Sequence, residues 1–289
     1  MKVAHLIITY TNPAQTERMI KRMWHPDFDF YVHVDAKLPI SSHDNLISIP
    51  NVYMIQNRVK VEWAAYSTIQ SEFNGIQEIL DSKRGYDFIS LLSGQGYPIK
   101  SPNQIKQFYK DREGKLLLKY RSFQDDWPEG MERIKRYYLA DYQFKGQYFL
   151  EKLINRIFPK RKVLPNIHFY GSSMFWAISP AAAAYVLETV NKDARVKWFF
   201  KHTWAPDEFL FQTILLNSSF APKVINENCH YYQHDPQTPN PKVLSIKDFN
   251  DIITSDRIYA RKFNMNESPE IMDAIDQYID QQITLENKN

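Results

Sequence analysis

Two adjacent carboxylates, Asp207 and Glu208, are the clearest candidates for acid–base chemistry in this sequence. They follow Pro206, and the apolar stretch Phe209–Leu216 comes next, so the sequence predicts that the pair opens a helix. In the first turn of a helix the backbone dipole favours an ionised carboxylate by up to about 1 kcal/mol. An ionised carboxylate at the mouth of a sheet is a suitable general base. The same pattern is also ordinary helix-start chemistry, so both interpretations remain open.

Basic residues near the end of the chain indicate a site for a negatively charged group. Arg261 and Lys262 lie between the aromatic residues Tyr259 and Phe263, and Lys242 follows a proline-rich loop. Two or three such cations can neutralise a diphosphate without a metal ion. A solvated pair of surface cations is the alternative interpretation of the same residues.

The sequence gives little support for a metal site. Its one Asp-x-Asp pattern, Asp27 and Asp29, lies where a strand is predicted to begin, away from the edge at which we expect ligands. No H-E-x-x-H pattern occurs, and His230 and His234 lack the helical context that would bring them together. We therefore expect no bound metal, and we keep a metal-dependent enzyme that uses Asp27 and Asp29 as an alternative.

Missing motifs and a small net charge exclude several other functions. The sequence has no P-loop, no GxGxxG and no G-x-S-x-G elbow. Its net charge of +3 predicts no nucleic-acid partner, and we expect the basic run Lys160–Lys162 to be a solvated loop. Cys229 is the only cysteine, which excludes an intrachain disulfide and is typical of a reducing compartment.

Strands and helices alternate through the first 120 residues. The predicted strands are Val3–Thr9, Phe28–Val34, Val52–Ile55, Tyr86–Ser93 and Leu116–Tyr120, with helices near 13–24, 69–80 and 102–109 between them. This alternation predicts an α/β fold with a mainly parallel sheet and helices on both faces. Ligands of such sheets bind at the carboxyl ends of the strands, so the loops after Thr9, Asp35 and Ser93 are the places to look. The turn after Ser93 is predicted to run from Gly94 to Pro98.

The rest of the chain is less regular. Residues 121–164 are rich in aromatic and basic side chains and show no clean period, whereas Gly171–Ile178 is predicted to be a strand. Helices are predicted from Pro180 to Val190 and from Pro269 to Ile279. The longest mostly apolar stretch has about 14 residues, and a membrane span needs roughly 20. We therefore expect a soluble, cytoplasmic protein that begins with a strand and not with a signal peptide.

Seven short motifs occur in order along nearly the whole chain. They are Ala4–Ile7 with Asn12–Pro13, His33–Lys37, Val61–Trp63, Leu91–Lys100, Tyr170–Ser173, Pro206–Glu208 with Gln212–Thr213, and Ala260–Phe263. In combination they resemble the core-2/I-branching β-1,6-N-acetylglucosaminyltransferase family, which also contains the peptide O-xylosyltransferases. The resemblance implies a GT-A-like nucleotide-sugar fold, inversion at the anomeric carbon and no need for a divalent metal.

The resemblance also implies roles for individual residues. Glu208 would be the catalytic base that deprotonates the acceptor hydroxyl, and Arg261 and Lys262 would hold the donor diphosphate, with Lys242 as a helper. The residues that would border the uridine part of the donor are Asp35, Lys37 and Trp63. The residues that would contact the acceptor are Gln95, Arg133 and Tyr232. Exposed aromatic side chains such as Tyr97, Trp204 and Tyr232 could stack on sugars, with core packing as the alternative.

On this basis the chain is interpreted as one glycosyltransferase domain, residues 1–289. Residues 1–120 would form the nucleotide-sugar half, 121–223 the acceptor and catalytic half, and 224–289 an extension that completes the diphosphate site. Animal relatives are Golgi membrane proteins with many cysteines, so this chain looks like a bacterial cytoplasmic version. Where many relatives have an aspartate–tryptophan pair, this sequence has Gln233 and His234, so the acceptor of the animal enzymes is not transferred.

The expected function is a metal-independent, inverting transfer from a UDP-sugar to a saccharide hydroxyl in bacterial surface polysaccharide synthesis. The donor remains open among UDP-N-acetylglucosamine, UDP-xylose, UDP-glucose and UDP-galactose. The acceptor would be a saccharide or a lipid-linked saccharide, with peripheral membrane contact left open and no nucleic acid involved. A non-catalytic saccharide-binding protein of the same fold and a metal-dependent transferase are the alternatives.

Overall fold

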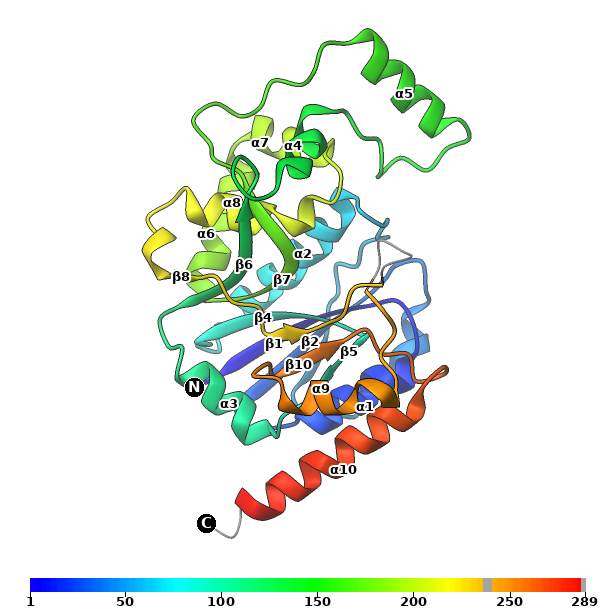
Figure 1. Ribbon diagram of the computed structural model, residues 1–289, viewed down its shortest axis with the longest axis vertical. Coiled ribbons are helices and arrows are strands. Elements are labelled where there is room, and N and C mark those ends of the chain that lie inside the picture. Colours follow the sequence, from blue (N-terminus) through cyan, green and yellow to red (C-terminus); the bar gives the residue numbers. More distant parts are fainter. Residues whose placement is uncertain (236–240, 287–289) are drawn as a thin grey trace.

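A computed structural model describes residues 1–235 and 241–286 and places a seven-stranded sheet between two layers of helices (Figure 1). The strands are β1 Val3–Thr9, β2 Phe28–Val34, β3 Val52–Met54, β4 Phe88–Ser93, β5 Gly96–Pro98, β6 Leu116–Ser122, β7 Tyr170–Ile178, β8 Val224–Ile225, β9 His230–Tyr231 and β10 Tyr259–Arg261. The helices are α1 Pro13–Met23, α2 Tyr66–Asp81, α3 Pro102–Lys110, α4 Pro128–Lys135, α5 Gln147–Ile157, α6 Pro180–Lys192, α7 Ala194–Lys201, α8 Leu210–Leu216, α9 Phe249–Thr254 and α10 Pro269–Glu286. Short 3₁₀ turns occupy Ile40–Leu46, Pro206–Glu208, Ala221–Lys223 and Ile246–Asp248.

The main sheet has the strand order β3-β2-β1-β4-β7-β6-β8. Every pairing is parallel except those of β7, which runs antiparallel to both β4 and β6. The predicted α/β class with a mainly parallel sheet is therefore confirmed. Alternate residues of β1 enter different cores: Leu6 packs with α2 and α6, whereas Ile7 packs with α1 and α10. The central strands are consequently covered on both faces.

Burial on both faces changes the meaning of the polar residues of β2. All seven residues of this strand are buried, including Asp29 and His33. Asp29 accepts a hydrogen bond from the Tyr86 hydroxyl, and His33 Nε2 accepts one from the Val59 amide at 2.9 Å. The alternating pattern of this strand thus separates an apolar face from a hydrogen-bonded polar face, both inside the protein.

Local signals place several helices where the sequence predicts them. Asn12 caps α1 by accepting from the Gln15 amide, Ser101 forms a capping box at α3, and Ser179 caps α6. Two predictions need correction: the turn predicted at Gly94–Pro98 contains the short strand β5, and Arg161 is buried. The stretch 121–164, whose sequence shows no clean period, contains α4 and α5. The Arg161 guanidinium donates to backbone carbonyls, among them that of Phe199 at 2.6 Å, and is not part of a solvated loop.

A second, three-stranded sheet joins the end of the chain to the main sheet. Its order is β5-β10-β9, with β10 antiparallel to β5 and parallel to β9. Arg261 of β10 pairs with Gly96 of β5, directly after the carboxyl end of β4. Part of the predicted proline-rich loop, residues 236–240, lies outside the described residues. Within the described ranges, none of the helices is long and apolar enough to cross a membrane.

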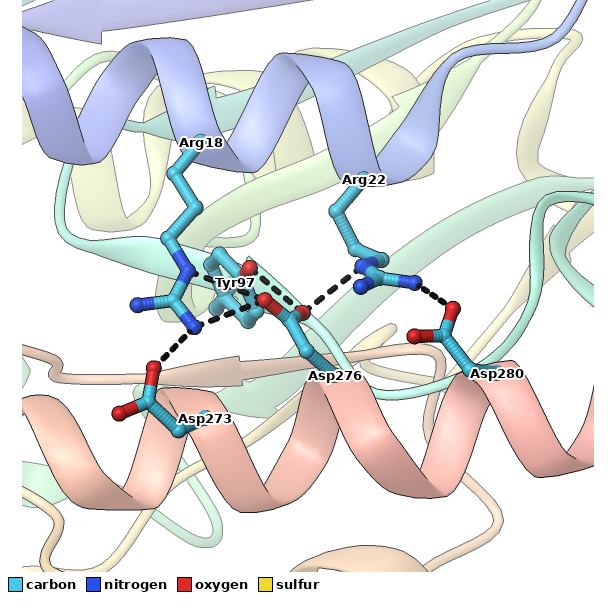
Figure 2. Close-up of polar contacts among 6 residues, drawn as sticks. All are labelled: Arg18, Arg22, Tyr97, Asp273, Asp276 and Asp280. Atoms are coloured by element: carbon cyan, nitrogen blue, oxygen red, sulfur yellow. Dashed lines mark hydrogen bonds and ion pairs between the residues drawn. The ribbon is translucent and has the colours of Figure 1, made fainter.

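Ion pairs attach α10 to α1 beneath this small sheet. Figure 2 shows Arg18 and Arg22 of α1 facing Asp273, Asp276 and Asp280 of α10. Asp276 lies at the centre: it accepts from Arg18 Nη2 at 2.8 Å, from Arg22 Nε at 2.8 Å and from the hydroxyl of Tyr97 at 2.7 Å. Since Tyr97 belongs to β5, the network fixes the strand on which β10 is paired.

We predict that Asp276→Ala lowers the free energy of unfolding by about 2 kcal/mol, because two guanidinium groups and a buried hydroxyl lose their common acceptor. Asp273→Ala is the matched control. Its carboxylate is 60% exposed and, among the residues described, pairs with Arg18 alone, whereas the Asp276 side chain is 17% exposed. The control should lose no more than about 0.5 kcal/mol. Urea unfolding of both variants measures the difference, and equal losses would refute a central role for Asp276.

Candidate functional site

Loops that follow three parallel strands lie together at the carboxyl edge of the sheet. Tyr10 follows β1, Asp35 follows β2 and Gln95 follows β4. The Tyr10 hydroxyl donates to Gln95 Oε1 at 3.3 Å, and the Asp35 amide donates to the carbonyl of Thr9 at 2.9 Å. The carbonyl of Gln95 accepts from the amide of Phe263 at 2.9 Å. At the edge where the sequence predicts a ligand, these loops therefore lie beside the end of β10.

Arg261 carries a positive charge into this edge from β10. Its guanidinium lies 4.7 Å from the ring centre of Phe175, and its buried Nε has no hydrogen-bond partner among the described residues. Burial lowers the pKa of Arg261, because the charged form loses water. Neighbouring groups that favour its charged form are Tyr10, Tyr232, Glu208 and Asp207. The structure thus brings Arg261, Tyr232 and the carboxylate pair into one electrostatic environment.

The Glu208 turn differs from the predicted helix start. Pro206–Glu208 forms a separate 3₁₀ turn, and α8 begins only at Leu210 because Phe209 has the non-helical angles φ −150° and ψ −8°. The helix-dipole argument for an ionised Glu208 is therefore wrong. The turn packs directly on β7 at Gly171, where a Cβ atom would lie 2.7 Å from the Glu208 carbonyl oxygen and 2.3 Å from Phe209 Cβ. Only glycine permits this approach.

A cation, in place of a helix dipole, accompanies Glu208. Arg133 of α4 forms an ion pair with Glu208 Oε2 at 2.5 Å, and its guanidinium lies 4.8 Å from the ring centre of Trp127. The Glu208 side chain is 35% exposed, so solvent and ligands can reach it. Arg133 therefore contacts Glu208, the predicted base. The prediction that Arg133 contacts an acceptor is not tested by this contact.

Two buried carboxyl groups lie behind Glu208. Burial, together with the charge of Glu208, raises the pKa of Asp207 to about 7. Burial also raises the pKa of Glu72 on α2 well above its usual range, with the charge of Asp207 as the second cause. Glu72 Oε2 accepts from Trp176 Nε1 at 3.4 Å, whereas Asp207 Oδ1 has no partner in the described part of the chain. Of the three carboxyl groups, Glu208 alone combines exposure with an arginine partner.

The predicted uridine-side residues occupy the loops after β2 and β3. Asp35 Oδ1 accepts from the backbone amide of Lys37 at 2.8 Å, and Lys37 Nζ forms an ion pair with Glu62 at 2.8 Å. Trp63 is exposed and packs edge-on against Trp204, with 5.1 Å between ring centres. Because Trp204 lies two residues before the 3₁₀ turn, this contact connects the uridine-side loop to Glu208.

The three predicted diphosphate cations have different surroundings. Lys242 is engaged by protein groups: Nζ donates to Asp248 at 2.7 Å and to Gln233 at 3.3 Å. Lys262 forms no ion pair within residues 1–235 and 241–286, although its carbonyl accepts from the amide of Leu244 at 2.8 Å. Of the three cations, Lys242 alone has an acidic partner in the described part of the chain, and the role of Arg261 and Lys262 in holding a diphosphate remains a prediction.

The aromatic candidates for sugar stacking also differ from one another. Tyr97 is buried, and its ring packs edge-on against Phe263, so the prediction that it is exposed is wrong. Tyr232 is half-buried, and its ring packs against His234 with 5.3 Å between centres. Trp204 contacts Trp63 and Tyr138. Tyr232 and Trp204 remain available for stacking at this edge.

The Asp-x-Asp pair lies at the other end of β2, where the sequence predicts it. Asp27 forms an ion pair with Lys106 at 2.5 Å, and Asp29 accepts from the Tyr86 hydroxyl at 2.5 Å. Both residues flank the amino end of β2, opposite the edge that holds Glu208. Across the described ranges, no group of three His, Cys, Asp or Glu side chains is arranged to hold a metal ion.

Sequence reasoning missed three residues at this edge: Tyr10, Phe175 and Glu72. Tyr10 follows a predicted strand directly, so the rule that ligands bind at carboxyl ends would have indicated it. Phe175 lies under Arg261 only because β10 returns to the main sheet. Glu72 lies in an amphipathic helical pattern, and nothing local marks it as a buried carboxyl group.

Comparison with known proteins places this geometry in context. Residues 3–253 match the protein family described as Core-2/I-Branching enzyme. A beta-1,3-galactosyl-O-glycosyl-glycoprotein beta-1,6-N-acetylglucosaminyltransferase of Bovine herpesvirus 4 (strain V. test) is 23% identical over 220 residues, which cover 73% of this chain and 46% of the viral protein. Xylosyltransferase oxt of Drosophila pseudoobscura pseudoobscura is 24% identical over 234 residues, 75% of this chain and 24% of the fly protein. The chain spans about half the length of the first of these relatives, and less of the second.

Solved structures of glycosyltransferases resemble the chain at low sequence identity. Mouse xyloside xylosyltransferase 1 in its apo form has a TM-score of 0.41 and 11% identity, over 91% of this chain and 98% of the mouse chain. The galactosyltransferase LgtC, in complex with donor and acceptor sugar analogues, has a TM-score of 0.42 and 8% identity, over 77% of this chain and 72% of that chain.

We predict that Asp207→Asn stabilises the protein increasingly as the pH rises from about 4 to 7. The pKa of this carboxyl group is raised from 3.8 to about 7, so in that window the folded protein retains a proton that the unfolded chain has lost. The contribution of Asp207 to stability is therefore present below pH 4 and lost as the pH rises through 7. Asparagine does not titrate, and the gain over the parent should approach at most about 4 kcal/mol.

Urea unfolding at a series of pH values measures this difference between variant and parent. Asp251→Asn is the control, because it makes the same chemical change at an exposed position. A difference that does not change with pH for Asp207→Asn would contradict the assignment of a protonated, buried Asp207.

Proposed function

The chain belongs to the Core-2/I-branching enzyme family, and on that premise we propose that it transfers a sugar from a UDP-sugar to a saccharide hydroxyl, with inversion and without a divalent metal. One observation carries the proposal. The half-buried Arg261 guanidinium, whose Nε lacks a partner in the described part of the chain, lies in the electrostatic environment of the exposed carboxylate Glu208. A buried guanidinium nitrogen without a hydrogen-bond partner is costly, and a diphosphate is an anion that would supply the missing acceptor.

The proposed reaction is a single in-line displacement. Glu208 takes the proton from the acceptor hydroxyl, whose oxygen forms a bond to the anomeric carbon while the bond from that carbon to the diphosphate oxygen breaks. Negative charge grows on the departing UDP, and the Arg261 and Lys262 cations stabilise it. No covalent sugar–enzyme intermediate is needed, because the attacking and leaving oxygens are on opposite sides of the anomeric carbon.

Glu208 is not in the first turn of an α-helix, and its charged partner is Arg133. The ion pair between the Arg133 guanidinium and Glu208 Oε2, at 2.5 Å, holds the carboxylate in place. Arg133 contacts Oε2, and we assign Oε1 to the acceptor hydroxyl. Burial raises the pKa values of Asp207 and Glu72. When both are protonated, they place no negative charge behind Glu208.

The remaining assignments extend the same arrangement. Asp35, Lys37 and Trp63 would border the uridine, and Gln95 and Tyr232 would contact the acceptor side. Lys242 would act by positioning, since Asp248 already binds its ammonium. We propose bacterial surface polysaccharide synthesis in a reducing cytoplasm as the setting, and the single cysteine supports a reducing compartment.

The first experiment is donor hydrolysis and UDP release across UDP-N-acetylglucosamine, UDP-xylose, UDP-glucose and UDP-galactose, with and without EDTA. We expect one donor to release UDP at a rate that EDTA leaves within about twofold, because Arg261 and Lys262 carry the charge that a metal would otherwise neutralise. Loss of release in EDTA would favour a metal-dependent transferase. Saccharide binding without release from any donor would favour a non-catalytic binding protein.

A second experiment separates the base from the cations. Glu208→Gln should lower the rate of transfer by about 10²–10⁴-fold and leave the Kd for UDP within about twofold, because the base does not hold the donor. Lys262→Ala should weaken UDP binding by about tenfold or more, because a charge-assisted contact to the diphosphate is lost. Lys247→Ala, at an exposed position of the same region, is the matched control.

Calorimetric UDP titration and a transfer assay give the two readouts for each variant. Equal loss of UDP affinity in Glu208→Gln and Lys262→Ala would overturn the assigned roles.

A further inference from the structure

Helix α5 turns its apolar face away from the protein. Helical spacing places Phe149, Leu150, Leu153, Ile154 and Ile157 on one face. Phe149 is 73% exposed and Ile157 is 66% exposed, and Gln147 is the only buried residue of the helix. A surface helix ordinarily buries this face against the core. In Figure 1, α5 lies at the end of the molecule opposite α10, held away from the sheet by two long connections.

The polar face of α5 is the one attached to the rest of the protein. Asn155 accepts from the Tyr137 amide at 2.9 Å and donates to the Tyr137 carbonyl at 2.7 Å. Glu151 accepts from the Leu139 amide at 2.9 Å, and Gln147 donates to the Leu139 carbonyl at 2.8 Å. These bonds fix the rotation of the helix about its axis. The outward apolar face is therefore a specified feature of the structure and not a consequence of a detached helix.

The stretch around α5 is strongly basic. Residues 135–162 contain eight Lys or Arg and two acidic residues, a net charge of +6, whereas the whole chain carries +3. Both acidic side chains are engaged by backbone amides, Asp141 by Ser67 and Glu151 by Leu139. A groove of about 610 Å³ lies between α5 and the end of α4. Its basic lining residues are Lys135, Arg136, Lys152, Arg156 and Lys160.

We propose that residues 135–162 form a docking surface for an anionic phospholipid membrane. The apolar face of α5 would enter the boundary between headgroups and acyl chains, as interfacial amphipathic helices do. Lys152 and Arg156 flank that face, and their long side chains can reach lipid phosphates while the apolar residues remain inserted. Each basic side chain near such a surface adds to the electrostatic attraction.

The charge favours a membrane over a second copy of this chain. Without the buried Arg161, residues 135–162 carry seven Lys or Arg and two acidic residues, a net charge of +5. A symmetric dimer through α5 would bring two such positive surfaces together, and like charges across an interface oppose association. Lysine is also depleted at protein–protein interfaces, whereas mixed aromatic and basic side chains are typical of membrane-surface helices. An anionic bilayer satisfies both the apolar face and the positive charge.

The docking surface begins two residues after Arg133, on the same helix α4 that contacts Glu208. If the proposed function holds, docking would place Glu208 close to an acceptor carried by the membrane. Membrane binding itself does not depend on that function, and the test below uses neither donor nor acceptor.

The test is flotation of the full chain with phosphatidylcholine vesicles, with and without phosphatidylglycerol. We expect binding to the anionic vesicles that weakens as salt is raised. Phe149→Ser combined with Ile157→Ser should weaken this binding at least about tenfold. Lys152→Gln, Arg156→Gln and Lys160→Gln combined should weaken it by about a hundredfold.

Matched controls carry the same changes elsewhere on the surface. Trp24→Ser with Ile47→Ser, and Lys83→Gln, Lys110→Gln and Lys247→Gln combined, alter exposed residues outside the docking surface and should bind as the parent does. Thermal unfolding should give the parent Tm for the α5 variants, since the altered side chains are exposed and buttress no core.

Three results would overturn the proposal. They are no binding to either kind of vesicle, equal binding to neutral and anionic vesicles, and a dimer in solution that the Phe149→Ser and Ile157→Ser changes dissociate while vesicle binding is absent. Failure of sugar transfer with intact vesicle binding would count against the proposed function alone.

Discussion

The pairing of β10 with β5 is the constraint on which the candidate site depends. It brings Arg261 beside Gly96, at the carboxyl end of β4, although the two strands are far apart in the sequence. Tyr97 fixes the position of β5, because its ring packs on Phe263 and its hydroxyl donates to Asp276 of α10. The ion pairs between α10 and α1 thus support the strand that positions Arg261, well away from any group that would react (Figure 2).

The charges at this edge are balanced in a way that suits an anionic ligand. Glu208 is compensated by Arg133, and burial favours the neutral form of both Asp207 and Glu72. Arg261 is half-buried, and its pKa is lowered because burial disfavours the charged form. Its buried Nε has no hydrogen-bond partner in the described part of the chain, and this reduces the stability of the folded protein. A ligand that brings negative charge to Arg261 would therefore bind with a favourable free energy, because it supplies the missing hydrogen-bond acceptor and an opposite charge.

The sequence predicts the elements whose signals are local. Asn12 and Ser179 mark helix starts, the limits of β1 follow from an apolar run, and those of β2 follow from its alternating pattern. The convergence of Arg261 with Glu208 is non-local, because it requires a strand from the last quarter of the chain to return to the main sheet, so the resemblance to a family was needed to suggest it. The 3₁₀ turn at Pro206–Glu208 was missed because its stop at Phe209 depends on packing against Gly171, which no pattern in residues 206–216 reveals.

The two sides of the site are built by different means. At the carboxyl end of β4, backbone pairing fixes Gln95 and Arg261, so their positions depend little on side-chain choice. On the other side, Arg133 belongs to the stretch 121–164, which has no clean period because much of its apolar surface is not directed to the core. Apolar residues that face solvent give no core-facing pattern for sequence reasoning to detect. The irregularity of that stretch and the outward face of α5 therefore have one physical cause: the apolar side chains of α5 face solvent and do not pack into the protein core.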